Sequence, residues 1–429
     1  MKILVIGGGG REHALAWQLA ASAGVSEVLV APGNAGTAPE PKCRNAAVAA
    51  DDVPGLLKLA QDEGIDFTVV GPEAALAAGV VDAFTAAGLR IFGPSQAAAE
   101  IESSKAFTKD FLARHHIPTA AYRVFTEAGP ALDYVATRGA PIVVKADGLA
   151  AGKGVVVAES VPQAQDAIRT LFGGDPDGAG APRDQTKLVI EDFLVGEEAS
   201  YIVVAAGNRY VPLASSQDHK RVYDGDTGPN TGGMGAYSPA PVVTPAVDAR
   251  VRAEIIEPTL RGLAAEGRAF TGFLYAGLMI AADGAPSVVE FNARLGDPET
   301  QPILMRLNSD LLALLQAAVD GDPGQAPLRW KPQPALGVVM AVAGYPGDIR
   351  KSDVIDGLDA APSPMTKVFH AGTRLDHGNI VTSGGRVLCV CSLGDDLSQA
   401  RTRAYASAAN IHWQGAHYRH DIGYRALIR

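Results

Sequence analysis

Residues 2–92 alternate short apolar runs with helical patterns, and this alternation limits the folds that the chain can adopt. Ile3–Ile6 is a continuous apolar run, which is typical of a buried strand in a parallel sheet. Leu15 and Leu19, four residues apart, mark one face of the helix that follows. Further strands are predicted at Val28–Val30, Phe67–Val70 and Leu89–Phe92. Repeated strand–helix units predict an N-terminal α/β domain, in which helices cover a parallel sheet.

A glycine turn, Gly7–His13, joins the first strand to the first helix. It fails the dinucleotide-binding pattern, because Glu12 stands at the third glycine position and no acidic residue closes the second strand. Backbone amides at a helix N-terminus can still hold one phosphate, with Arg11 beside them. A tight turn without a ligand explains the glycines equally well. Two further turns, which contain Asn34 and Glu73, follow later strands and could converge with this turn on a sugar phosphate.

The stretch Val288–Gln301 has the pattern of a strand whose end is charged. Because side chains two residues apart share a face of a strand, Glu290, Asn292 and Arg294 point the same way. A carboxylate and an amide oxygen suit Mg²⁺ or Mn²⁺, and a guanidinium binds carboxylates or phosphates. A solvated strand end is the simpler explanation when the stretch is considered alone.

A glycine-rich segment, Gly148–Gly154, lies between two apolar strands. It is not a Walker A loop, because its glycines are too closely spaced and a strand follows it. With Lys145 at its base and Lys153 at its tip, it has the composition of a loop that folds over phosphates and excludes water. An ordinary hairpin with surface lysines is the alternative. The next strand, Val189–Glu198, could form an adenine slot with Glu198 on the ribose, or a plain core strand.

Residues 215–238 form the densest polar stretch, which includes Asn230, Thr231, Gly232 and Gly233. So long a stretch without apolar periodicity indicates a functional loop or disorder, and the flanking strands favour function.

Length, charge and cysteine content narrow the classes of function. The chain has 429 residues and a formal net charge of −10, which disfavours a nucleic-acid partner. No apolar run reaches the ~20 residues of a membrane span. Three cysteines without CxxC spacing, and no signal peptide pattern, predict a reducing, cytoplasmic setting. The proline- and glycine-rich segment 321–334 is a candidate domain linker.

Taken together, the motifs resemble the phosphoribosylamine–glycine ligase (glycinamide ribonucleotide synthetase) family, which are ATP-grasp enzymes of purine biosynthesis. The resemblance runs nearly end to end. Its most specific parts are Gly9–Leu15, Lys145–Gly154, Gln217–Arg221, Gly228–Gly235 and Glu290–Gln301.

The resemblance implies a reaction, a cofactor and a role for each site residue. The family joins glycine to 5-phosphoribosylamine through glycyl phosphate and converts ATP to ADP and phosphate. Glu290 and Asn292 would bind Mg²⁺ or Mn²⁺, and Asp218, Lys220 and Arg294 would orient the substrates. The implied ATP contacts are Lys105, Lys145, Gly152, Lys153, Gly154, Glu191, Phe193 and Glu198. The turn Gly9–His13 would hold the phosphate of phosphoribosylamine. The implied substrate contacts are Gly9, Gly10, Arg11, Glu12, His13, Asn34, Glu73, Asn230, Thr231, Gly232 and Gly233.

We therefore expect a multidomain α/β and α+β chain that acts on small molecules, with a monomer as the simplest state. Its parts would be a Rossmann-like domain at 1–104, an ATP-grasp domain at 105–325 with a glycine-rich lid at about 122–193, and a β-rich domain at 331–429. Three rival interpretations stay open: another ATP-grasp ligase acting on bicarbonate or formate, a nucleotide-binding regulatory protein without turnover, and a nicotinamide dehydrogenase, against which the failed glycine pattern counts.

Overall fold

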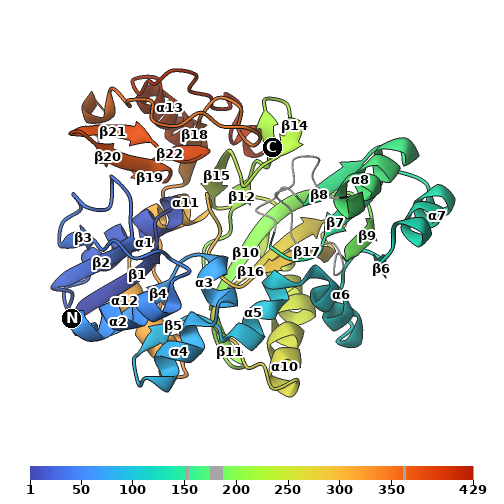
Figure 1. The fold of residues 1–429 in the computed structure, drawn as a ribbon, viewed down its shortest axis with the longest axis horizontal. Helices are drawn as coiled ribbons and strands as arrows, with labels where there is room; N and C mark the ends of the chain where they lie inside the picture. The colour runs from blue at the N-terminus through green and yellow to red at the C-terminus, as the bar shows by residue number, and fades with distance from the viewer. Residues whose placement is uncertain (150–153, 174–186, 361–363, 429) are drawn as a thin grey trace.

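The computed structural model describes residues 1–149, 154–173, 187–360 and 364–428. In these ranges, four sheets of four or five strands organise the chain (Figure 1). We name them the N-terminal, outer, central and C-terminal sheets. The mixed α/β architecture confirms the predicted fold class. Within the described part, no helix has the length and apolar character needed to span a membrane.

The N-terminal sheet is parallel, with the order β3-β2-β1-β4-β5. Ile3 and Val5 pack into one core and Leu4 and Ile6 into another, so the strand is buried on both faces, as predicted. Its strands are β1 (Lys2–Gly7), β2 (Glu27–Pro32), β3 (Cys43–Asn45), β4 (Phe67–Val70) and β5 (Ile91–Phe92). Its helices are α1 (Gly10–Ala20), α2 (Val53–Glu63), α3 (Glu73–Ala77) and α4 (Val80–Ala86).

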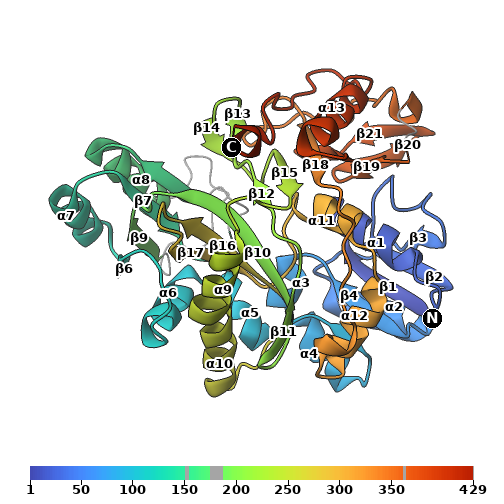
Figure 2. The ribbon, with the colours of Figure 1, turned by 180° about the vertical axis from the view of Figure 1, so that it is seen from behind.

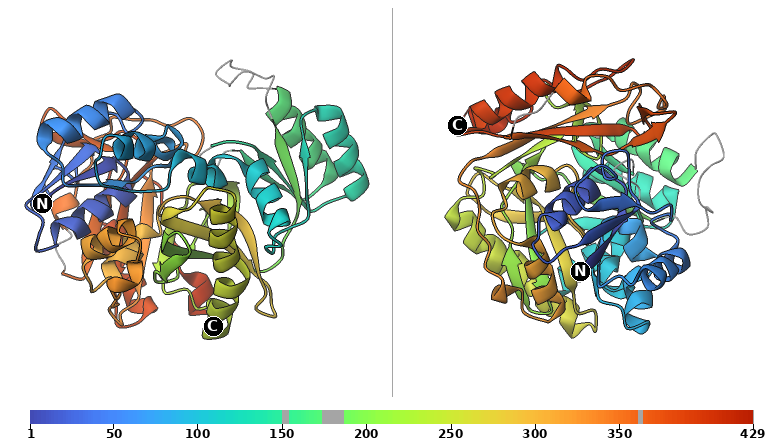
Figure 3. Two further views of the ribbon diagram at one scale, coloured as in Figure 1. Left: turned by 90° about the horizontal axis from the view of Figure 1, so that it is seen from below. Right: turned by 90° about the vertical axis from the view of Figure 1, so that its left-hand side faces the viewer.

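The outer sheet is antiparallel, with the order β6-β9-β7-β8, and projects from one side of the molecule (Figure 3, left). It has its own small core beneath two helices. Its elements are β6 (Tyr122–Phe125), α7 (Ala128–Arg138), β7 (Ile142–Ala146), β8 (Val155–Ala158), α8 (Val161–Gly173) and β9 (Leu188–Asp192). Two helices, α5 (Gln96–Ser103) and α6 (Lys105–Arg114), connect it to the N-terminal sheet.

The central sheet is antiparallel, with the order β11-β10-β16-β17. Figure 2 shows α9 and α10 against one side of it, and α12 packs into the core of the other face. Its strands are β10 (Glu197–Ala206), β11 (Arg209–Pro212), β16 (Thr271–Ile280) and β17 (Pro286–Asn292). The helices are α9 (Pro245–Val251), a π-helical segment (Arg252–Ile256), α10 (Glu257–Ala265), α11 (Thr300–Arg306) and α12 (Leu311–Val319).

The C-terminal sheet has the order β12-β15-β18-β22-β19, and it takes two strands from the polar stretch 215–238. Tyr237 pairs with Leu336, for example, so a segment placed by sequence in the middle domain completes a sheet of the last one. The strands are β12 (Gln217–Asp218), β15 (Gly235–Ser238), β18 (Ala335–Ala341), β19 (Thr366–His370) and β22 (Arg386–Leu393).

Two hairpins and several helices complete the C-terminal part. The hairpins are β13 (Arg221–Tyr223) with β14 (Thr227–Asn230), and β20 (Thr373–Asp376) with β21 (Asn379–Thr382). The helices are α13 (Leu397–Ala408) and α14 (Tyr424–Leu427), with 3₁₀ turns at Pro323–Gln325 and Leu358–Ala360.

Arg419 fastens the C-terminal tail to the β13–β14 hairpin. Its side chain is fully buried, donates two hydrogen bonds of 2.7 Å to the Asp421 carboxylate, and donates to Asp226 at 2.8 Å.

Arg419→Ala leaves the carboxylates of Asp226 and Asp421 without the cation that they share, so we expect the free energy of unfolding to fall by about 3 kcal/mol in urea denaturation. The exposed Arg374→Ala should change it by less than about 0.5 kcal/mol. Equal losses in the two variants would contradict this role.

Candidate active site

A cleft of about 480 Å³ opens where the four sheets approach one another. Most residues that the sequence analysis assigned to the site line this one cleft. They are Arg11, Glu73, Lys105, Lys145, Gly154, Glu191, Phe193, Glu198, Asp218, Lys220, Asn230, Thr231, Gly232, Glu290, Asn292 and Arg294. The assigned residues Gly9, Gly10, Glu12, His13, Asn34 and Gly233 do not line it. Gly152 and Lys153 lie outside the described residues.

Strand β17 carries Glu290 and Asn292 to the cleft through a bulge. Its pairing with β16 shifts register next to Gly277, and Val289 is the inserted residue. The Val289 carbonyl accepts a hydrogen bond of 3.1 Å from Lys145 Nζ. Because a bulge re-aims the side chains beyond it, this irregularity sets the direction of both oxygen donors.

These two donors fit a hard divalent cation. Burial opposes ionisation of Glu290, but the charges of nearby basic groups lower its pKa: these groups are Lys220, Lys145, Lys105 and Arg294. The Asn292 side chain is only 8% exposed, yet no hydrogen bond to it is found among the described residues. In the same ranges no group of three or more His, Cys, Asp or Glu could hold a metal by itself. A cation here would therefore complete its coordination with substrate or water oxygens.

Glu191, at the end of β9, holds two lysines. Its carboxylate lies 2.8 Å from Lys145 Nζ and 2.8 Å from Lys109 Nζ. Burial lowers the pKa of Lys109 to about 8, against the attraction of Glu191. Sequence analysis missed Lys109, although it lies one helical turn after Lys105 on α6. Lys105 donates to the Gly148 carbonyl at 2.7 Å, so it lies at the entrance to the glycine-rich segment.

Arg294 is fixed by two glutamates from the N-terminal half of the chain. Its guanidinium lies 2.7 Å from Glu102 and 3.1 Å from Glu73. Arg11 lies 3.9 Å from the same Glu73, which links the glycine turn to the end of β17. Burial raises the pKa of Glu73, but Arg294 and Arg11 outweigh it and bring the pKa to about 2. Glu102, on α5, was not predicted from the sequence.

The protein's own carboxylates occupy amides of the glycine turn. The Gly9 amide donates to Glu12 at 2.6 Å, and the Arg11 amide donates to Asp297 at 3.4 Å. A side chain at Gly7 would collide with Glu12, which is 2% exposed. The Gly9 amide is thus already paired with the buried Glu12, and Arg11 is the residue of this turn that lines the cleft.

His13 and Asn34 tie the N-terminal unit to the C-terminal sheet. His13 Nδ1 accepts from the His370 amide at 2.8 Å, so Nε2 carries the proton and donates to Glu40 at 2.9 Å. The side-chain amide of Asn34 donates to the His370 carbonyl at 2.9 Å and to the Gly8 carbonyl at 3.0 Å. His13 and Asn34, both predicted to contact substrate, thus form hydrogen bonds within the protein in this structure.

Asp218 and Lys220 lie in the polar stretch that the sequence favoured as functional. Lys220 Nζ lies 3.0 Å from Glu198 and 3.7 Å from Glu290. Burial, reinforced by Glu299 and other nearby carboxylates, raises the pKa of Asp218 to about 8, although Lys220 opposes the shift. A carboxyl group so strongly perturbed within a cleft is typical of a functional site.

Arg386, at the start of β22, fastens the loop that holds Asn230–Gly233. Its Nη1 donates to the Gly232 carbonyl at 2.5 Å and to the Asp297 carbonyl at 2.6 Å. The Gly232 amide donates to the Tyr345 hydroxyl at 3.0 Å. The C-terminal sheet therefore positions one wall of the cleft, which sequence analysis did not anticipate.

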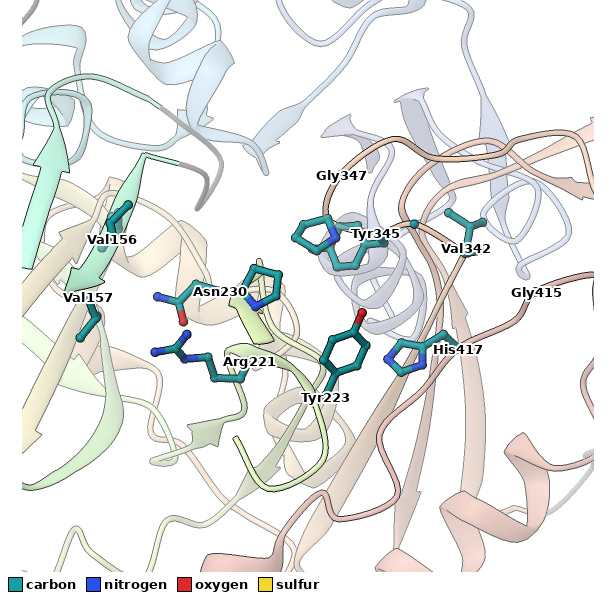
Figure 4. Close-up of a pocket in the computed structure, with 15 residues that line it drawn as sticks. Val156, Val157, Arg221, Tyr223, Asn230, Val342, Tyr345, Gly347, Gly415 and His417 are labelled. Atoms are coloured by element: carbon teal, nitrogen blue, oxygen red, sulfur yellow. The ribbon is translucent and has the colours of Figure 1, made fainter. Parts of the chain in front are cut away.

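A second hollow, of about 810 Å³, adjoins the cleft (Figure 4). Val156 and Val157 of β8 lie on one side of it, and Arg221, Tyr223 and Tyr345 lie on the other. The two hollows share the lining residues Val155, Val157, Asn230 and Tyr345, so they lie next to each other between the outer and C-terminal sheets.

Two antiparallel sheets meet at the cleft: the outer one supplies Lys145 and Glu191, and the central one supplies Glu290 and Asn292. One sheet thus offers positive charge for phosphates, and the other offers oxygen ligands for a metal ion. This arrangement is that of an ATP-grasp enzyme, and the ATP-grasp family model matches this part of the chain. Family models of phosphoribosylglycinamide synthetase match in chain order, with the N domain at residues 1–102, the ATP-grasp (A) domain at 103–300 and the C domain at 335–425. The chain belongs to the phosphoribosylglycinamide synthetase family.

Relatives match over the whole length of the chain. It is 62% identical to a phosphoribosylamine–glycine ligase of Xanthomonas axonopodis pv. citri, covering 100% of this chain and 99% of the relative. The corresponding Vibrio cholerae protein is 59% identical, with the same coverage. The crystal structure of the Thermotoga maritima phosphoribosylamine–glycine ligase superimposes with a TM-score of 0.84 at 33% identity, covering 99% of this chain and 100% of that one. Biotin carboxylase from Campylobacter jejuni shares only the fold, at 14% identity and a TM-score of 0.72.

Arg386→Ala should weaken catalysis without unfolding the protein. It removes the donors that hold the Gly232 and Asp297 carbonyls, and the loss of hydrogen bonds from a charged group predicts a roughly 10- to 100-fold lower kcat/KM. Steady-state kinetics, with circular dichroism as a check on folding, measures this change. Arg386→Lys keeps the positive charge but lacks the forked donors of the guanidinium, so its kcat/KM should lie between those of Arg386→Ala and the wild type. Unchanged kcat/KM in Arg386→Ala would show that catalysis does not depend on these two hydrogen bonds.

Proposed function

We propose that the chain ligates glycine to 5-phosphoribosylamine with ATP, through a glycyl phosphate intermediate, and releases glycinamide ribonucleotide, ADP and phosphate. This is a step of de novo purine biosynthesis. The observation that carries the proposal is the full-length match to ligases of this name, joined to a cleft that holds lysines, oxygen donors and a fixed arginine together.

In this proposal ATP lies between the outer and central sheets. Lys105 and Lys145 contact the phosphates, together with Gly152, Lys153 and Gly154. Glu191, Phe193 and Glu198 surround the adenosine. Phe193 is 41% exposed and lines the cleft, so an apolar face is available for the base.

Glu290 and Asn292 would hold Mg²⁺ or Mn²⁺, since both ions favour carboxylate and amide oxygens. Such a cation, when bound, neutralises the triphosphate so that a carboxylate can approach the γ-phosphorus. Lys220 and Arg294 add fixed positive charge on the substrate side, held in place by their glutamate partners.

Phosphoribosylamine would bind between the N-terminal turns and the loop Asn230–Gly233. Arg11 and Glu73 are the two predicted substrate contacts from the N-terminal turns that line the cleft. Gly9, Gly10, Glu12 and His13 of the glycine turn, and Asn34 of the turn after β2, would form the wall behind them. Arg294, Lys220 and Asp218 would orient the acyl phosphate as the amine attacks its carbonyl carbon and phosphate leaves.

The domain limits 1–104, 105–325 and 331–429, with the lid at about 122–193, are part of the proposal. The family models support limits near residues 102 and 335. A cytoplasmic setting, a monomeric state, and the absence of nucleic-acid and membrane partners also belong to it.

Release of ADP with each substrate omitted in turn tests the reaction. We expect release to need ATP, glycine and phosphoribosylamine together, and to fall to background without a divalent cation. Bicarbonate or formate in place of glycine should give no release. Turnover with bicarbonate would favour a carboxylase of the same fold instead.

Glu290→Ala should lose turnover far more than stability. The change removes one of two oxygen donors, and losing a fixed electrostatic group at the reacting phosphates predicts a roughly 100- to 1,000-fold lower kcat. The Glu290 side chain is 37% exposed, and ion pairs at such positions contribute little to folding. The melting temperature should therefore stay close to that of Asp283→Ala, an exposed change on the same hairpin. Parallel losses of melting temperature and activity would mean that Glu290 is structural.

A further inference from the structure

Two carboxylates in the cleft lack the cations that the others have. Asp218 is 8% exposed, yet its carboxylate has no hydrogen bond or ion pair with any described residue. Lys220 lies two positions further along but is directed at Glu198 and Glu290. The carboxylate of Glu299 also lines the cleft and is 3% exposed.

Two hydroxyl groups contact one oxygen of the Glu299 side chain. The Tyr275 hydroxyl donates to Glu299 Oε1 at 2.7 Å, and the Ser200 hydroxyl lies 2.9 Å from the same oxygen. Across the described residues, Oε2 receives no hydrogen bond. A Cβ atom at Gly296 would lie 2.5 Å from Oε2, so only a glycine at this position avoids a collision with that oxygen. Two buried carboxylates thus have capacity for a cation, and no basic side chain among the described residues forms an ion pair with either of them.

We propose that Asp218 and Glu299, with Tyr275 fixing Glu299, bind the α-ammonium group of the amino-acid substrate. The inference rests on the proposed function and adds to it the recognition of the amine. Lys220 and Arg294 attract the carboxylate end of a zwitterion, whereas the two carboxylates attract its ammonium end, so the cleft orients the molecule by charge.

This contact also answers a chemical problem of the reaction. The amino-acid substrate carries an amine of its own, which would attack a second acyl phosphate if it were neutral. An ammonium beside carboxylates has a raised pKa, because the charged form is favoured. The protonated amine has no lone pair for attack, and the amine of phosphoribosylamine remains the nucleophile. The same pair would reject small acids that lack an ammonium, since the carboxylates would then stay unpaired.

The test compares glycine with glycolate, which replaces the ammonium by a hydroxyl group. ADP release is measured with wild type, Asp218→Asn, Glu299→Gln and Tyr275→Phe, at saturating ATP and phosphoribosylamine. We expect kcat/KM for glycine to fall about 100-fold in the two amide variants, as for a lost charged hydrogen bond. The preference for glycine over glycolate should fall in parallel, while KM for ATP changes less than about 3-fold. Tyr275→Phe should show a smaller effect of the same kind.

Glu254→Gln alters a partly exposed carboxylate of the π-helical segment, which pairs with Arg250 of α9. It is the matched control and should keep the preference. If Glu299→Gln fails to fold, Asp218→Asn carries the test, because it removes no hydrogen bond found among the described residues. An unchanged preference with a raised KM for ATP would overturn the inference and indicate a second metal ion instead. Absence of ADP release with glycine in wild type would refute the proposed function itself, which separates the two failures.

Discussion

The pairing of buried charges from distant parts of the chain is the constraint on which the cleft depends. Glu191 holds Lys145 and Lys109, and Glu73 and Glu102 hold Arg294. A buried charge is costly unless it is paired, so these partners fix one another before any ligand binds. Fixed charges need little rearrangement when a phosphate is transferred, and this is the arrangement that favours catalysis.

The sharing of strands between units gives the site its walls. Strands β12 and β15 leave the central part of the chain and complete the C-terminal sheet. This exchange brings Asp218 to the cleft and places Arg386 against the loop at Gly232. The C-terminal part therefore contributes to the cleft through Tyr345, which lines it, and through Arg386, whose side chain donates to the carbonyls of Gly232 and Asp297.

The groups that break the pairing rule mark the places for ligands. Asn292, Asp218 and Glu299 are buried polar side chains with unused hydrogen-bonding capacity among the described residues. Native proteins satisfy nearly all such groups, and local violations are expected where function requires them. Glu12 and His13, by contrast, form hydrogen bonds with partners inside the protein.

Local patterns in the sequence determined much of this protein. The parallel N-terminal sheet follows from apolar runs such as Ile3–Ile6, and the oxygen donors of β17 follow from the alternation at Glu290 and Asn292, because both depend on neighbours along the chain. The bulge at Val289, which aims those donors, depends on pairing with β16. Glu102 and Arg386 gave no signal either, because their hydrogen-bond partners, the Ala293 amide and the Gly232 carbonyl, lie 191 and 154 residues away. Residue types and periodicity are properties of the sequence, whereas the pairing of charges across the cleft exists only once the four sheets have packed together.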